Sequence, residues 1–460
     1  MRLKKTAAIA LSAAMVLGLT ACGGGNTSGG SGDSQNSGNT GGGATTAAAG
    51  AETTVASKGD EAGGGDEAVT LNFYAWSDEE GIFTKLADAY MANHPNVTIK
   101  CQFIPSNDYM TKLLTAFSGG GDIDCFGVSS PPSLAQVQAK GSVMALDDMI
   151  AANGTDTSGY EGTLESIAID GKTYALPYKT SSWVVYYNKD IFDAAGVPYP
   201  EGDWTWEEYY DIAGKLTSGE GANKIYGSLN FQPTSLWWRV PANSKGATNP
   251  VNDDELHDWM EAAQFCKSLS DAGYQPPYED MASESGADYT GNFLQGKYGM
   301  YFTGDWGVEM LNTSIANGDG DVKYDIAPLP HWEGEEAATP GAPGLLMVAQ
   351  NAKNPEVAFD FISYCAGAEG ADLLLDNDYF PAWQSEETIA TYTEGKTAPE
   401  HIEYIVNQKI ISQVPCDEYY NSVTNIIKEE VSLYLIGEQD IETTEANSKK
   451  RMQDEVLNAQ

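Results

Sequence analysis

Strand-like and helix-like segments alternate at the start of the apolar part of the chain. Apolar residues alternate with other residues over 69–75 and recur at helical spacing over 82–90. The same pair of patterns returns over 97–103 and 109–117, and 123–128 has the composition of a third strand. Parallel strands of such a β-α-β-α-β run are joined by right-handed crossovers. The sequence therefore predicts an α/β fold.

Polar and aromatic side chains come directly after these predicted strands. Ligands of open α/β sheets bind beyond the carboxyl ends of the strands. Ser77-Asp78-Glu79-Glu80 also has the pattern of a helix capping box, which is compatible with ligand contact. The predicted ligand-binding residues at this edge are Trp76, Asp78, Glu79, Ser129 and Ser130.

The first 21 residues have the features of a signal peptide. Three positive charges lie within residues 2–5, and the apolar stretch Thr6–Thr20 follows them. This stretch is shorter than the roughly 20 apolar residues that a membrane-spanning helix needs. We therefore expect residues 1–21 to be removed.

Leu19-Thr20-Ala21-Cys22-Gly23 resembles the lipobox of bacterial lipoproteins, in which the cysteine after the cleavage site is lipidated. The alternative is an ordinary signal peptide with an incidental cysteine. The segment 22–68 is rich in Gly, Ser, Thr and Ala, a composition that cannot bury a core. We expect a membrane anchor at Cys22, followed by a disordered tether to residue 68.

The charge of the chain excludes some partners. There are 66 Asp and Glu against 25 Lys and Arg, a formal net charge of -41. Such a charge repels a phosphate backbone, so nucleic acid is a poor partner. The 460 residues, 42% of them hydrophobic, are enough to bury a large core in two or more lobes.

The cysteines after Cys22 are irregularly spaced and odd in number, so they indicate neither a disulfide framework nor a metal site. Cys101 and Cys125 lie in strand-like segments that could be neighbours, so one bridge is possible. Buried thiols are the favoured interpretation. These cysteines are Cys101, Cys125, Cys266, Cys365 and Cys416.

An ordered set of segments resembles the extracellular sugar-binding proteins of ABC importers, the maltose-binding-protein-like group. The longest, Tyr174–Pro200, reads YALPYKTSSWVVYYNKDIFDAAGVPYP and contains a strongly β-prone run and a helix that ends at Gly196. The resemblance extends from Val69 to Gln460. Its other segments are Trp204–Glu208, Phe293–Trp306, Ala327–Pro330, Ala358–Ile362 and Tyr379–Pro381.

This resemblance implies a two-lobed periplasmic-binding-protein-like fold of type II. Each lobe would contain a mainly parallel sheet flanked by helices, and three chain segments would form the hinge, near 178–183, 331–342 and 383–393. The implied lobes are discontinuous in sequence. Lobe 1 would comprise 69–180 plus 342–385, and lobe 2 would comprise 181–341 plus 386–460.

Sugar sites combine flat aromatic rings with planar hydrogen-bonding groups. Trp306 begins a predicted helix directly after the predicted strand 298–303, where the family presents an aromatic side chain to the cleft. Asp305 precedes Trp306 and is expected either to contact the ligand or to cap the helix. For Trp306 the alternative is packing at the helix start.

Trp237-Trp238-Arg239 lies in a segment with neither strand nor helix periodicity. Arg239 is the only arginine between Arg2 and Arg451, and its guanidinium could bind two hydroxyls or a carboxylate. The alternative is an ion pair with one of the many acids. We include all three residues among the predicted ligand-binding residues.

The remaining candidates lie near the predicted hinge segments or at the start of a C-terminal helix. Each has a short polar or aromatic side chain suited to a sugar. They are Ser181, Trp183, Tyr379, Trp383, Tyr419 and Tyr420.

Motifs that would indicate an enzyme are missing from the sequence. The four histidines, His94, His257, His331 and His401, form neither HExxH nor a cluster. No P-loop or GxGxxG follows a predicted strand. We therefore expect no catalytic residue, no metal and no cofactor.

The sequence thus predicts a monomeric, lipid-anchored receptor that captures a mono- or oligosaccharide and delivers it to the permease of an ABC importer. The scarcity of arginine argues against phosphorylated ligands, and the acidity of the chain leaves a polyamine as the second ligand class. A secreted glycoside hydrolase and an adhesion protein are weaker alternatives, since no carboxylate pair, repeat or all-β pattern stands out.

Overall fold

The computed structural model describes most of the chain after the predicted tether. The described residues are 68–160, 162–229, 236–283, 288–377, 379–394 and 398–458. The predicted signal peptide, Cys22 and the tether up to residue 67 lie outside them, so these remain predictions. Within the described part, no helix is long and apolar enough to cross a membrane.

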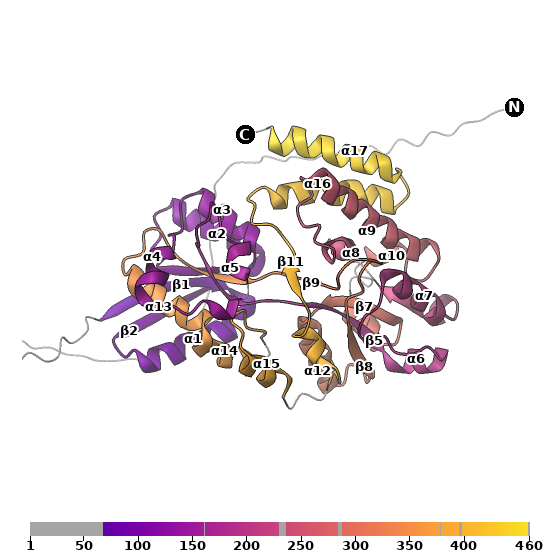
Figure 1. Cartoon of the computed structure of the whole chain (residues 1–460), viewed down its shortest axis with the longest axis horizontal. Coiled ribbons are helices and arrows are strands. Elements are labelled where there is room, and N and C mark those ends of the chain that lie inside the picture. Colours follow the sequence, from indigo (N-terminus) through magenta and orange to yellow (C-terminus); the bar gives the residue numbers. More distant parts are fainter. Residues whose placement is uncertain are drawn as a thin grey trace, which may run out of the picture. The chain divides into compact units, whose positions relative to one another are not determined.

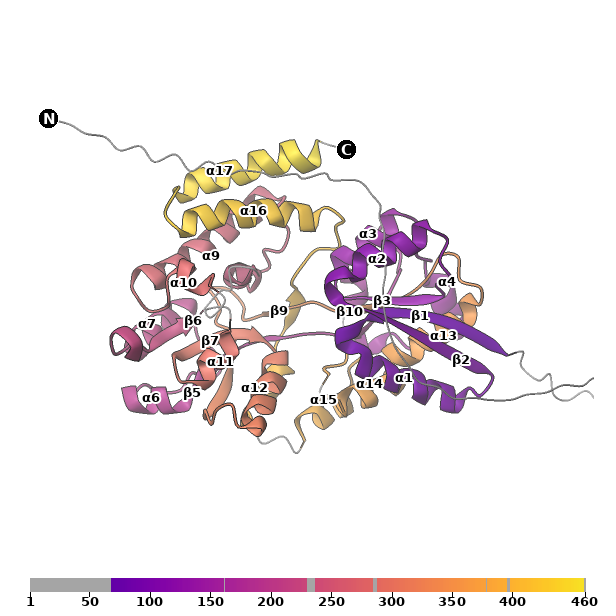
Figure 2. The same ribbon diagram turned by 180° about the vertical axis from the view of Figure 1, so that it is seen from behind.

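The first sheet has five strands in the order β2-β1-β3-β10-β4. Figure 1 labels β1 and β2, and Figure 2 also labels β3 and β10. β1 (Val69–Trp76) is parallel to both β2 (Val97–Ile104) and β3 (Cys125–Val128), as the sequence predicts. β10 (Gly344–Val348) comes from much later in the chain and lies antiparallel between β3 and β4 (Leu176–Lys179).

Helices cover both faces of this sheet. α2 and α3 lie on one side, and α1, α13 and α14 lie on the other (Figures 1 and 2). The rings of Phe83 on α1 and Phe361 on α13 meet Phe73 of β1 edge-on, with centroids 5.1 and 5.5 Å away. The helices are α1 (Glu80–Asn93), α2 (Ser106–Ser118), α3 (Pro131–Ala139), α4 (Asp147–Asn153), α5 (Thr163–Ser166), α13 (Pro355–Ala366) and α14 (Ala368–Leu375).

The predicted capping box before α1 is wrong. Ser77–Glu79 forms a 3-10 turn, and neither this turn nor α1 has a side-chain cap at its start. The Glu79 side chain is instead buried, where it accepts hydrogen bonds from the Tyr178 hydroxyl and the Lys179 ammonium. A buried carboxylate needs such partners, and this tertiary pairing overrides the local capping pattern.

The second sheet has four strands in the order β6-β7-β5-β8. β5 (Trp183–Asn188) is antiparallel to both β7 (Tyr298–Gly304) and β8 (Tyr324–Pro328), while β6 (Tyr226–Leu229) is parallel to β7. This sheet is therefore mixed, in contrast to the mainly parallel sheet expected for each lobe. Every residue of β5 and β7 is buried, which explains their continuous apolar and aromatic composition.

The helices around the second sheet include the last two long helices of the chain, which pack on each other and on α9. α6 ends at Gly196 with a φ of 67°, which confirms the predicted glycine cap. The helices are α6 (Lys189–Ala195), α7 (Trp206–Leu216), α8 (Val240–Asn243), α9 (Asp253–Asp271), α10 (Tyr278–Met281), α11 (Tyr289–Leu294), α12 (Trp306–Asn317), α16 (Tyr420–Leu435) and α17 (Ile441–Met452). α15 (Glu386–Thr393) packs beside α14.

The segments that connect the two sheets are hydrogen-bonded to one another. The backbone N–H of Thr180, between β4 and β5, donates to the Phe380 carbonyl at 3.0 Å. The backbone N–H of Ala342, before β10, donates to the Ser181 hydroxyl at 3.1 Å. Next to them, β9 (Thr339–Gly341) pairs in parallel with β11 (Ile410–Ser412).

All five cysteines of the described part are free thiols. Cys101 on β2 and Cys125 on β3 both pair with Phe73, from opposite sides of β1. A whole strand therefore separates them, and the bridge considered from the sequence does not form. Burial raises the pKa of the Cys101 thiol to about 11.

Candidate ligand pocket

A pocket of about 370 Å³ lies beside the start of β5. This volume falls within the range of small-molecule sites. Four of its lining residues, Trp183, Trp237, Arg239 and Trp306, are ligand-binding residues predicted from the sequence. The described lining residues are Trp183, Leu236, Trp237, Arg239, Val240, Trp306, Gln413, Asn425 and Lys428.

Three indole rings form an edge-to-face cluster in this pocket. The Trp183 ring lies between the other two, with centroids 5.3 Å from Trp237 and 5.4 Å from Trp306. The ring planes cross at 86° and 82°, respectively. Trp183 is only 2% exposed, whereas Trp306 is 39% exposed. Trp306 therefore offers the largest accessible aromatic surface of the three.

The turn between β7 and α12 places Trp306. Its indole lies over Gly304, where an added Cβ would come 1.9 Å from the Trp306 ring, so only glycine leaves room for it. Between them, the Asp305 carboxylate accepts a hydrogen bond from the Ser182 N–H at 3.2 Å. This bond ties the start of α12 to the segment between β4 and β5.

Arg239 belongs to a short 3-10 helix, Trp237–Arg239, and is 8% exposed. Its Nη1 donates to the Tyr420 hydroxyl at the start of α16. The guanidinium also lies over the rings of Trp259 and Tyr420, at 5.3 and 5.8 Å from their centroids. Burial raises the pKa of Tyr420 and outweighs the opposing effect of Arg239, so this phenol stays neutral.

Trp238, also predicted to bind ligand, is 3% exposed and packs edge-on against Trp259. Its ring belongs to the core of the second sheet. Tyr419 is half-buried and starts the last turn before α16, where its N–H donates to Asp417. The Ser181 hydroxyl donates a hydrogen bond to the Ala342 carbonyl and accepts one from the Ala342 N–H.

The candidates near the first sheet are distributed differently. Trp76 is 6% exposed and meets Phe83 and Tyr109 edge-on, so its ring contributes to the core. Asp78 and Ser129 are exposed. The other members of this group are half-buried, apart from the buried Glu79 described above: Ser130, Tyr379 and Trp383.

Two of these half-buried residues have defined contacts. The Lys179 ammonium lies 5.3 Å from the centroid of the Tyr379 ring. Trp383 packs on Gly159, where an added Cβ would come within 2.6 Å of the indole. Ligand contact by either residue stays a prediction.

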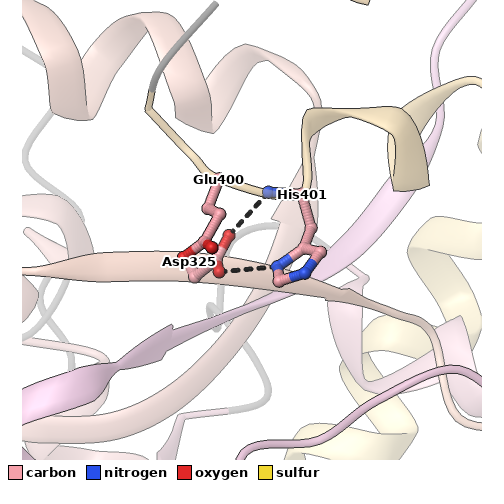
Figure 3. A group of neighbouring side chains, drawn as sticks. All are labelled: Asp325, Glu400 and His401. Atoms are coloured by element: carbon pink, nitrogen blue, oxygen red, sulfur yellow. Dashed lines mark hydrogen bonds and ion pairs between the residues drawn. The ribbon is translucent and has the colours of Figure 1, made fainter.

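One group of side chains in the described part has the composition of a metal site: Asp325, Glu400 and His401 (Figure 3). Asp325 is fully buried and accepts hydrogen bonds from the His401 N–H at 3.1 Å and its Nδ1 at 2.8 Å. The Lys189 ammonium lies 3.0 Å from Glu400 and 3.9 Å from Asp325. The ammonium is a counter-ion for both carboxylates, so we interpret the group as an ion-pair network that fastens residues 400–401 to β8.

Comparison with known protein families decides the class of this chain. Residues 76–372 match the bacterial extracellular solute-binding protein family. The chain belongs to this family. Its members are binding proteins, which agrees with the absence of enzyme motifs from the sequence.

Individual solute-binding proteins resemble the chain over most of its length. A sugar transporter structure from Rhizobium etli, in an open conformation, superposes with a TM-score of 0.76 at 28% identity and covers 84% of this chain and 100% of that one. A putative binding protein of Brucella abortus is 27% identical over 67% of this chain and 74% of its own length. An sn-glycerol-3-phosphate-binding periplasmic protein of Brucella melitensis is 26% identical over 72% and 81%.

Sequence reasoning missed the polar side of the pocket of this solute-binding protein. Asn425 and Lys428 lie one turn apart on the same face of α16, and Gln413 follows β11. On a helix, polar residues at this spacing look like an ordinary solvent-facing surface. The only nearby signal was Tyr419-Tyr420 at the start of the same helix.

Proposed function

We propose that this solute-binding protein is the sugar receptor of an ABC importer. The observation that carries the proposal is the cluster of Trp183, Trp237 and Trp306 in one pocket with the amides of Gln413 and Asn425. Aromatic rings stack on the C–H faces of a sugar, and planar amides both donate to and accept from its hydroxyls. The resemblance to a sugar transporter of Rhizobium etli supports the same ligand class.

The pocket argues against the polyamine that the acidity of the chain suggested. A polyamine site needs carboxylates beside its aromatic rings. Among the described residues that line the pocket, none is acidic, and two, Arg239 and Lys428, are cationic. The acidic residues that give the chain its negative charge are therefore not among the described lining residues, so the net charge of the chain does not predict the charge of the ligand.

The relation of the pocket to the connecting segments suggests how binding acts on the protein. Trp183 is the first residue of β5, and Thr339 Oγ1 bonds both its N–H and its carbonyl at 2.8 Å. Trp183 thus joins the pocket to two of the segments between the sheets. A ligand that contacts Trp183 and the first lobe together shifts the hinge equilibrium toward closure.

Delivery and anchoring complete the proposal. The closed form presents its sugar to the transmembrane permease, and the lipid at Cys22 keeps the monomeric receptor on the outer face of the cytoplasmic membrane. The lipobox-like segment Leu19–Gly23 and the Gly/Ser/Thr-rich tether after it support this arrangement.

Fluorescence titration tests the proposal, because three tryptophans line the pocket. Neutral mono- and oligosaccharides should change the tryptophan emission in a saturable manner, and the sugar should be recovered unchanged. Spermidine should cause no saturable change. Saturable binding of spermidine alone, or cleavage of an oligosaccharide, would contradict the proposal.

A further inference from the structure

Arg239 is a buried cation that has no acidic partner among the described residues. It is 8% exposed, and among the described residues no carboxylate forms an ion pair with it. Arg451, the other arginine of the described part, pairs instead with Glu429, Glu430 and Glu455. The protein has 66 acidic residues, so the lack of a described carboxylate paired with Arg239 is unusual.

The neighbours of Arg239 do not neutralise its charge. Tyr420 accepts one hydrogen bond through a neutral hydroxyl, and Trp259 offers only its ring face. The Nε–H of Arg239 has no hydrogen-bond acceptor in the described part of the chain. A buried, unpaired charge is costly, so a group that neutralises it gains much of that cost as binding energy.

The surrounding pocket is rich in hydrogen-bond donors. Arg239 shares it with Lys428 and with Trp183, whose buried Nε1–H has no acceptor among the described residues. Gln413 and Asn425 add two amides that can donate. No described lining residue supplies a negative charge. Because two of these groups are cations and none is an anion, the set favours a ligand that carries a negative charge beside its hydroxyls.

We propose that the pocket binds an anionic group of the solute, a carboxylate or a phosphate, which serves as the counter-ion of Arg239, while the ammonium of Lys428 adds to the positive charge around it. The solute is then an acidic sugar or a phosphorylated polyol whose C–H face lies on Trp306. This inference rests on the proposed function and narrows its ligand class. It reverses the expectation drawn from the scarcity of arginine, because the one arginine in the middle of the chain lines the pocket.

Matched pairs of probes test the anionic group. Calorimetry on the whole chain compares D-glucuronate with D-glucose, and glycerol 3-phosphate with glycerol. At least one anion should bind tenfold or more tightly than its neutral counterpart, and more weakly at high salt because charge attraction is screened. The pair that responds distinguishes a carboxylate ligand from a phosphate ligand.

Variants assign the effect to the pocket. Lys428 is half-buried on α16. The Lys428→Gln variant should weaken binding of the anion tenfold or more and leave binding of the neutral probe unchanged. Arg239→Gln should do the same. Lys323→Gln removes the same charge from an exposed site of the same lobe, where the lysine pairs with Asp190, and should leave binding unchanged.

The outcomes separate this inference from the function on which it rests. Three results would refute the proposal of an anionic group in the ligand. They are equal or tighter binding of the neutral probes, no binding of either pair, and binding that neither Lys428→Gln nor Arg239→Gln weakens. Neutral oligosaccharides titrated in parallel decide the sugar-receptor proposal by themselves. If they bind reversibly and the binding does not depend on charge, the sugar-receptor proposal stands and only the proposal of an acidic ligand is refuted.

Discussion

The indole of Trp306 stands edge-on to the buried indole of Trp183, with ring centroids 5.4 Å apart and planes at 82°. One ring is fixed in the second sheet and the other begins the helix that follows β7. The pair therefore combines a rigid base with an accessible face. This relationship makes Trp306 the side chain whose removal tests ligand contact with the least disturbance of the fold.

Trp306→Ala should weaken sugar binding more than tenfold, a loss of about 1.4 kcal/mol. The ring is 39% exposed, so its removal should cost little stability. Calorimetric binding and far-UV circular dichroism measure the two effects. Met310→Ala is the matched control, because Met310 is 38% exposed on the same helix and is not among the pocket residues. Equal affinity of Trp306→Ala and wild type would show that Trp306 has a structural role and does not contribute to binding.

Gly304→Ala should weaken binding without removing any atom from the pocket. The added methyl group would lie 1.9 Å from the Trp306 ring and force the indole out of its position. Gly81→Ala on α1 is the control, since nothing lies within 4 Å of an added Cβ there, and it should stabilise by about 0.5–1 kcal/mol. Undiminished binding by Gly304→Ala would show that the position of the indole does not matter.

Thr339→Val should destabilise the protein by about 1–3 kcal/mol, because it leaves the Trp183 N–H and carbonyl without their bonds to the Thr339 hydroxyl. Thr339 is fully buried, so water cannot replace the hydroxyl. Urea unfolding measures the change. Thr98→Val on the exposed face of β2 is the control and should leave the midpoint unchanged. Equal midpoints for both variants would mean that the segments between the sheets do not depend on this contact.

The network around His401 predicts a pH dependence of stability. The hydrogen bond with Asp325 raises the pKa of His401 above its ordinary value of about 6.5. Because the folded state binds this proton more tightly, the stabilisation is complete below about pH 6.5 and is lost as the pH rises through the folded pKa. His401→Gln should therefore flatten the fall in unfolding free energy above pH 6.5. An unchanged slope would exclude His401 as its source.

Cys22→Ala should release the protein from the membrane, because it removes the thiol that carries the proposed lipid. Fractionation of cells into membrane pellet and medium measures the change. Cys416→Ala, a half-buried thiol within the described part, should leave the protein in the pellet. Continued pelleting of Cys22→Ala would refute the lipid anchor.

Several residues of the pocket stood out in the sequence because each interrupts a local pattern. Trp183 starts a β-prone run at a predicted hinge, Trp306 directly follows a strand, and Arg239 is an isolated arginine. The structure brings these three into one pocket. Trp76 is the last residue of β1, yet it is buried in the first core, so position at a strand end does not by itself determine the direction of a side chain.

What the sequence could not predict depends on contacts between distant segments. The capping pattern at Ser77 is outweighed by the pairing of Glu79 with Lys179, which only the folded chain brings together. Asn425 and Lys428 reach the pocket because α16 packs beside Arg239, although helical periodicity alone marks them as solvent-facing. β5 is antiparallel to β7 and β8, and the composition of β5 does not reveal this direction because it depends on the neighbouring strands.

Calorimetric titration of the whole chain with neutral and acidic sugars, followed by chromatography of the recovered ligand, tests the central claim most directly. The account predicts saturable binding of one sugar per chain and recovery of that sugar unchanged. Recovery of a shortened oligosaccharide would contradict it by showing an enzyme. Binding of polyamines without any sugar would contradict it by showing a receptor for a different class of solute.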